Sequence, residues 1–127
     1  ICSAAVADYR PIEVSDNKIK KKSQKLNLEL EKTQDILEEL GRQKINQCLV
    51  GFALETNDVL EYAKQKLKNK NLDFIVANSA IEIGSGFGVD TNKITIIDKH
   101  NKISKFELKS KHEVALDIVN YLIDFIK

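Results

Sequence analysis

The sequence predicts an α/β protein, a three-layer fold with a mainly parallel central sheet and an added antiparallel hairpin. Two apolar runs, within residues 48–53 and 74–77, are typical of parallel strands buried on both faces. Between them, four apolar residues fall on one face of a predicted helix: Val59, Leu60, Ala63 and Leu67. Strand, helix and strand in this order form a βαβ unit, and we expect the other elements to pack around it.

The length of 127 residues fits one domain or part of one, and a net charge of +1 argues against bulk electrostatic binding of nucleic acid. No apolar run approaches the roughly 20 residues of a membrane span, and no signal peptide is visible. We therefore expect a cytoplasmic protein that binds neither nucleic acid nor membranes. Cys2 and Cys48 lie far apart in apolar surroundings, which predicts buried free thiols, with a disulfide as the minor alternative.

The first residues predict a strand that is already under way. Residues 1–6 are small and apolar without an initiator methionine, so we expect a buried strand and a chain that begins inside a larger domain. Pro11 cannot donate to a ladder and ends this strand. Asp8 then lies just past a strand's carboxyl end, where ligands bind in open α/β sheets. The polar residues 12–25 predict a mobile flap that carries the lysine run Lys18-Ile19-Lys20-Lys21-Lys22.

Beyond this flap, apolar and polar residues alternate over residues 26–30, which predicts a strand with one buried face. Capping-box spacings then mark three helix starts, at Asp35 with Glu38, Asp58 with Glu61 and Ser110 with Glu113. Gly41 suits the position after the first helix. The last helix is expected to bury one apolar face, made of Val114, Ala115, Ile118, Val119, Leu122 and Ile126.

Residues 84–88 form a glycine-rich loop that resembles a dinucleotide fingerprint only superficially. The true fingerprint opens a helix, whereas residues 93–98 predict a strand, so a flexible connection is favoured over a phosphate cradle. Residues 94–98 and 103–108 predict a hairpin that turns at Lys99-His100-Asn101.

Lysines are the main candidates for chemistry. Lys66 and Lys70 are i,i+4 neighbours, so their ammonium groups share a helical face and could grip a polyphosphate. The alternative is that they only complement the helix C-terminus. Asp35 is a cap, but the free N–H groups of its helix turn could also receive ligand oxygens. Neither His100 nor His112 has metal-ligand spacing, and no nucleophile–base pair can be proposed.

These stretches together resemble the phosphopantothenate–cysteine ligase family, also called phosphopantothenoylcysteine synthetases. The resemblance runs in order along nearly the whole chain. It is carried by Ala4 to Pro11, Lys18 to Lys21, Asp35 to Leu37, Val50 to Thr56, Lys70 to Asp73, Val76 to Asn78 and Gly86 to Asp90. The resemblance implies a Rossmann-like fold, with residues 1–127 as the C-terminal part of a single ligase domain and residues 12–25 as its flap.

The implied reaction joins 4′-phosphopantothenate to cysteine in two steps. The acid attacks the α-phosphate of CTP to give an acyl-cytidylate and pyrophosphate, and cysteine then displaces CMP. Mg²⁺ accompanies the triphosphate. FMN is expected only if a decarboxylase half, common in bacterial bifunctional relatives, is attached elsewhere.

Carried over by position, the resemblance implies roles for named residues. Lys18 is the catalytic flap lysine, and Asp8 meets the nucleotide and its Mg²⁺. The other nucleotide-binding residues are Gln34, Asp35, Ile36, Leu37, Phe52, Lys66 and Lys70. Gln34 departs from the family's usual proline, but a backbone contact does not depend on the side chain.

The family's N-terminal glycine-rich loop and its asparagine for phosphopantothenate are not among these residues. We therefore expect this fragment alone to hold CTP and to be inactive. Family members pair as homodimers through the segment after the flap, which fits residues 26–30 as a dimerisation strand. The alternatives are a non-catalytic Rossmann-like nucleotide-binding module and, more remotely, a nucleic-acid binder; the choice between CTP and ATP stays open.

Overall fold

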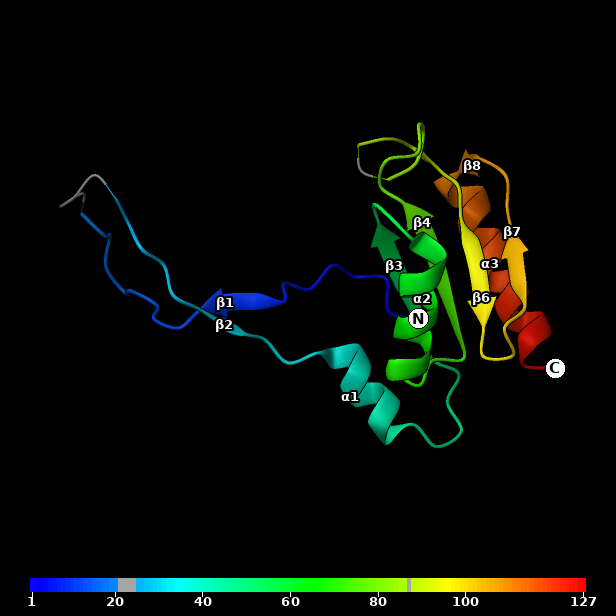
Figure 1. Ribbon diagram of the computed structural model, residues 1–127, viewed down its shortest axis with the longest axis horizontal. Coiled ribbons are helices and arrows are strands. Elements are labelled where there is room, and N and C mark those ends of the chain that lie inside the picture. The colour runs from blue at the N-terminus through cyan, green and yellow to red at the C-terminus, as the bar shows by residue number, and fades with distance from the viewer. Residues whose placement is uncertain (21–24, 87) are drawn as a thin grey trace.

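The computed structural model describes residues 1–20, 25–86 and 88–127. Its central sheet has the order β3 (Val50–Glu55), β4 (Phe74–Ser79), β6 (Thr95–Asp98) and β7 (Ile103–Lys105). β3 and β4 are parallel, whereas β4–β6 and β6–β7 are antiparallel. Helix α2 (Val59–Asn69) covers one face and α3 (Lys111–Phe125) the other (Figure 1). The α/β class and its three layers are confirmed, with a sheet that combines a parallel pair and an antiparallel hairpin.

Alternation along β3 and β4 divides the core into two clusters. Ala53, Ile75 and Ala77 pack with Ala63 and Leu67 of α2. On the other face, the buried residues of the sheet and α3 form the second cluster: Val50, Phe74, Val76, Ile94, Ile96, Val114 and Ile118. The βαβ unit and its buried helical face are therefore as predicted.

The three helix starts share the same capping-box spacing in the sequence but differ in the capping bonds that they form. Ser110 and Glu113 form a complete capping box on α3. Asp35 caps α1 (Ile36–Gln43) by accepting a bond of 3.0 Å from Glu38 N–H. The prediction for Asp58 is wrong, because this residue adopts φ 46° and ψ 39° and its side chain makes no capping bond. Aspartate tolerates this left-handed conformation better than most residues, but an N-cap residue that bonds the first turn usually has extended dihedral angles.

The buried face of α3 is shifted from the predicted one. Val114 and Ile118 are buried and Leu122 packs against them, but Ala115, Val119 and Ile126 are exposed. Their place is taken by two aromatic residues, Tyr121 and Phe125, whose rings meet Phe74 edge-on at centroid distances of 5.2 and 5.6 Å. Aromatic pairing on β4 therefore rotates the helix relative to its aliphatic stripe.

The N-terminal third forms an arm that extends from the body of the molecule (Figure 1). Its antiparallel strands are β1 (Tyr9–Pro11) and β2 (Leu30–Lys32). The predicted buried strand over residues 1–6 is wrong: these residues are mainly exposed, with one parallel bridge from Cys2 to Gly51. The predicted strand over residues 26–30 begins only at Leu30, and Asp8 precedes a strand instead of following one.

Pro11 lies inside the β1–β2 ladder, contrary to expectation. The bonded pairs on either side are Thr33 N–H to Asp8 O at 2.9 Å and Ile12 N–H to Glu29 O at 3.1 Å. The bonded positions alternate, so Pro11 opposite Leu30 occupies a non-bonded pair. Its missing N–H therefore costs no hydrogen bond.

The loop after β4 contains Gly84, Gly86 and Gly88, all at positive φ, and leads to the short pair of β5 (Thr91–Asn92) and β8 (Lys109–Ser110). It opens no helix, as predicted. Lys21 and Lys22 of the lysine run and Phe87 of the loop lie outside the described residues. Cys2 and Cys48 are free thiols, as predicted, but are half-buried. None of the described helices has the length and apolar character needed to cross a membrane.

Candidate functional site

Helix α1 lies against the end of α2 because Gly41, in the last turn of α1, allows a close approach. A Cβ at this position would lie 2.0 Å from the backbone oxygen of Lys70. Gly41 is thus inside α1, not after it as predicted, and the helix continues to Gln43. This packing brings Lys70 Nζ to 2.7 Å from Asp35 Oδ2.

The Asp35 carboxylate has two functions at this junction, as the cap of α1 and as the partner of Lys70. Burial raises its pKa, but the hydrogen bonds from Lys70 and from Glu38 N–H outweigh that effect, and the pKa lies below its ordinary value. Asp35 is therefore ionised at neutral pH, and it neutralises Lys70.

Lys66, one turn earlier on α2, reaches a different carboxylate. Its Nζ lies 2.7 Å from Oε1 of Glu55, the last residue of β3. The side chains of Lys66 and Lys70 are 43% and 23% exposed. Because neither ammonium is sealed in the core, each can exchange its carboxylate for another anion.

Asp8 is tied to the same region through Thr33. The Thr33 N–H donates to Asp8 O at 2.9 Å, and its hydroxyl donates to Ala7 O at 2.6 Å. Thr33 is followed by Gln34 and Asp35, so Asp8 lies where the arm joins the segment that leads into α1. The structure thus brings the predicted residues Asp35 and Lys70 into direct contact, and Thr33 links Asp8 to the segment that leads through Gln34 into this junction.

The remaining predicted site residues are dispersed. Leu37 packs into the core beside α2, and Ile36 is exposed. Phe52 packs into the cluster on the α3 face, so its side chain is on the opposite side of the sheet from Lys66 and Lys70. Lys18 lies exposed on the arm. Only the backbone of Phe52 is therefore available to a ligand on the α2 face.

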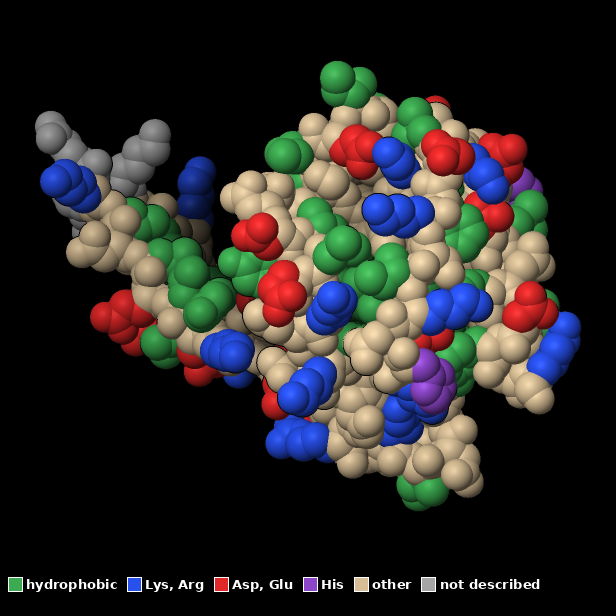
Figure 2. All heavy atoms as spheres, turned by 45° about the vertical axis from the view of Figure 1, so that its right-hand side comes forward, with side chains coloured by type: hydrophobic (Ala, Val, Ile, Leu, Met, Phe, Trp, Pro, Cys, Tyr) green, Lys and Arg blue, Asp and Glu red, His purple; other side chains and the backbone are tan. Residues whose placement is uncertain are grey.

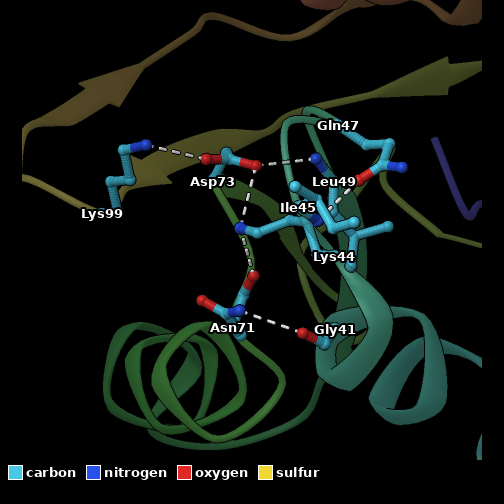
Figure 3. A network of polar contacts seen from close by, with 8 residues as sticks. All are labelled: Gly41, Lys44, Ile45, Gln47, Leu49, Asn71, Asp73 and Lys99. Carbon is cyan, nitrogen blue, oxygen red and sulfur yellow. Dashed lines mark hydrogen bonds and ion pairs between the residues drawn. The ribbon is translucent and has the colours of Figure 1, made fainter.

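Three residues that the sequence did not indicate have clear positions here: Glu55, Thr33 and Asp73. Their side-chain contacts are with residues 11 to 29 positions away, so no local pattern in the sequence marks them. Asp73, for example, is a buried carboxylate that joins the loop before β3 to the turn after β6 (Figure 3).

Among the described residues, no group of three or more His, Cys, Asp or Glu side chains is placed to hold a metal ion. Mg²⁺ is usually bound through one or two carboxylates together with substrate phosphates. The single exposed carboxylate of Asp8 fits that mode and does not fit an all-protein cage.

Comparisons with known proteins identify the family of this chain. The family described as DNA/pantothenate metabolism flavoprotein C-terminal domain matches residues 1–125. A cysteine/cysteine sulfinic acid decarboxylase of an unknown prokaryotic organism is 54% identical over 127 residues, 99% of this chain and 35% of the relative. The coenzyme A biosynthesis bifunctional protein CoaBC of Bacillus subtilis (strain 168) is 49% identical over 119 residues, 94% of this chain and 29% of that protein. The chain thus spans about a third of the length of these relatives.

Comparison with solved structures supports the same family. The crystal structure of the C-terminal domain of CoaBC aligns with a TM-score of 0.72 at 39% identity, covering 94% of this chain and 50% of that one. The DNA/pantothenate metabolism flavoprotein from Streptococcus pneumoniae aligns with a TM-score of 0.74 at 21% identity, covering 95% and 60%, which shows the shared fold. The chain therefore belongs to the DNA/pantothenate metabolism flavoprotein C-terminal domain family and is homologous to the C-terminal, phosphopantothenate–cysteine ligase domain of CoaBC.

Proposed function

We propose that this chain is the CTP-holding part of a phosphopantothenate–cysteine ligase and so acts in coenzyme A biosynthesis. The observation that carries the proposal is the family match over residues 1–125, together with two lysines on α2 whose partners are exchangeable carboxylates. A nucleotide with Mg²⁺, 4′-phosphopantothenate and cysteine are the proposed small-molecule partners.

The proposed chemistry depends on cations that hold phosphates. Partly exposed ion pairs contribute only about 0–1 kcal/mol, so a triphosphate can displace Glu55 from Lys66 and Asp35 from Lys70. Lysine is a common phosphate ligand because its compact charge needs no fixed geometry. The α1 N-terminus adds the positive end of its dipole. Bound Mg²⁺ would lower the charge of the triphosphate, with Asp8 as its protein ligand.

The substrates supply the reacting groups themselves. The carboxylate of 4′-phosphopantothenate is the nucleophile in the first step and the amine of cysteine in the second, so the protein contributes positioning and electrostatic stabilisation. Lys18 is proposed to close over the acyl-cytidylate from the arm. Since the family's residues for the acid lie outside this sequence, we expect no CMP release by this chain alone. Sustained CMP release with all three substrates would show that the absent part is dispensable.

Calorimetry of Mg·CTP binding tests the nucleotide role. We expect Lys66→Ala and Lys70→Ala each to weaken binding by about tenfold, as the loss of a charge-assisted contact implies. Lys68→Ala is the matched control, since Lys68 is an exposed lysine of the same helix. Titration with Mg·ATP establishes the base preference.

Equal losses for Lys66→Ala, Lys70→Ala and Lys68→Ala would contradict specific contacts by the first two. Unchanged affinity in all three variants would favour the non-catalytic nucleotide-binding module instead. The relative named as a decarboxylase does not favour that activity for this chain, because the name belongs to a protein about three times as long.

A further inference from the structure

We propose that Thr33 is a positioning residue that ties the backbone of Asp8 to the cap of α1, whose Asp35 pairs with the proposed phosphate-binding lysine Lys70. The inference rests on the proposed function and goes beyond it, because it assigns a role to a residue that neither the sequence pattern nor the predicted ligand contacts include. Thr33 stands where the arm joins the body, between β2 and the cap of α1.

The hydrogen bonds of Thr33 continue the β1–β2 ladder by one pair. Tyr9 lies opposite Lys32 and Arg10 opposite Glu31, so Thr33 lies opposite Asp8 in the same register. Its N–H donates to Asp8 O at 2.9 Å. Its hydroxyl adds a bond of 2.6 Å to Ala7 O, which a backbone ladder alone would not provide. Two consecutive carbonyls are therefore held by one residue.

Asp8 lies at a bend directly before β1, and Thr33 directly follows β2. The bond from Thr33 N–H extends the pairing of the ladder to these two residues, so Asp8 is held through its backbone opposite Thr33.

Few other contacts hold Asp8. Residues 3–8 are all exposed, and the backbone around Asp8 has no core packing to fix it. On the other side, Thr33 is followed after one residue by Asp35, which is bonded to Glu38 N–H and to Lys70 at 2.7 Å. Thr33 thereby connects the backbone of Asp8 to the α1–α2 junction.

The test measures CTP affinity by calorimetry with and without Mg²⁺ in the whole chain. Thr33→Val preserves shape and the backbone bond but removes the hydroxyl. We expect it to weaken Mg·CTP binding roughly 3- to 10-fold, the range for one lost hydrogen bond. Metal-free CTP binding should change less than twofold, because the lysines are untouched. Thr33→Ser should restore the Mg²⁺-dependent part.

Thr91→Val is the matched control, because the Thr91 hydroxyl makes an equivalent 2.6 Å bond to Gly84 O away from this region. Asp8→Asn should lose the same Mg²⁺-dependent affinity, and the double variant with Thr33→Val should lose no more than either alone. Additive losses, or a Thr33→Val affinity equal to that of Thr91→Val, would overturn the role of Thr33 while leaving the proposed function intact. A complete lack of Mg·CTP binding by the unsubstituted chain would overturn both.

Discussion

Asp73 is a buried residue whose carboxylate accepts three hydrogen bonds, and the sequence predicted no role for it. Its Oδ2 accepts from Leu49 N–H at 2.8 Å and from Lys44 Nζ at 3.1 Å, and its Oδ1 accepts from Lys99 Nζ at 2.9 Å (Figure 3). Lys44 also donates to Asn71 O at 2.6 Å. One carboxylate therefore joins the beginnings of β3 and β4 to the turn of the hairpin.

Because Asp73 is ionisable, the contribution of its contacts to stability depends on pH. Burial raises its pKa, but the bonds from Leu49 N–H, Lys99 and Lys44 outweigh burial, so the pKa in the folded chain lies below the ordinary 3.8. A lowered carboxyl pKa means that the folded state binds the proton less readily than the unfolded state. Its stabilising contribution is fully present above about pH 4 and is lost as the pH falls through the folded pKa.

We expect Asp73→Asn to lower the free energy of unfolding by about 1–3 kcal/mol at pH 7, because two lysines and a backbone N–H lose a charged acceptor. The difference from the unsubstituted chain should narrow as the pH falls below 4. Urea unfolding between pH 7 and pH 3 measures both effects. Asp124→Asn is the control, since Asp124 is 77% exposed in its pair with Lys127. If the difference in the free energy of unfolding stays constant between pH 7 and pH 3, the ionisation of Asp73 is not its cause.

At the scale of elements, α2 and α3 show that one sequence spacing can have two outcomes. Ser110 is extended, and its hydroxyl accepts from Glu113 N–H at 3.2 Å. Asp58 is left-handed and makes no such bond, although Glu61 follows at the same distance along the chain. The backbone conformation at the cap, set by the preceding loop, decides whether the side chain can reach the first turn.

This contrast predicts unequal effects of cap substitutions. Ser110→Ala should destabilise the chain by about 0.5–2 kcal/mol, the usual loss for a used cap. Asp58→Asn keeps a residue that tolerates positive φ and should change stability by less than about 0.5 kcal/mol, the usual range for a surface change away from special features. Thermal and urea unfolding of both variants provide the comparison, and equal losses would contradict it.

At the scale of the whole molecule, the arm is the least buried part of the described chain. Hydrophobic side chains gather along it in the space-filling view (Figure 2). A hollow of about 650 Å³ on the arm is lined by Ile12, Val14, Ile19, Leu26 and Leu28 together with polar neighbours. Leu26 and Leu28, which lie two positions apart, are 74% and 60% exposed, and a contiguous exposed apolar patch is typical of a protein–protein contact site.

We expect the arm to mediate the homodimer that the family resemblance implies. Light scattering at micromolar concentration should give a dimeric mass, and Leu28→Asp should shift it to the monomer by placing a charge in the interface. Leu116→Asp is the control, because Leu116 is 51% exposed on α3, away from the arm. A monomeric mass for the unsubstituted chain would contradict the dimer.

The central βαβ unit could be derived from sequence because its signals are local. Apolar runs and a 3.6-residue period indicate which face of each element is buried. Ala63 and Leu67 are buried, as this pattern predicts. The Ser110 cap and the hairpin turn at Asn101, with φ 64°, are equally short-range features.

The candidate site could be derived only in part, because its contacts join segments far apart in the chain. The i,i+4 spacing indicated that Lys66 and Lys70 share a face, but not that Glu55 and Asp35 neutralise them separately. Nor did alternation alone assign Phe52 to the α3 side of the sheet. Such pairings depend on which helix covers which face and on how closely backbones approach, as at Gly41, and these are properties of packing that no local period encodes.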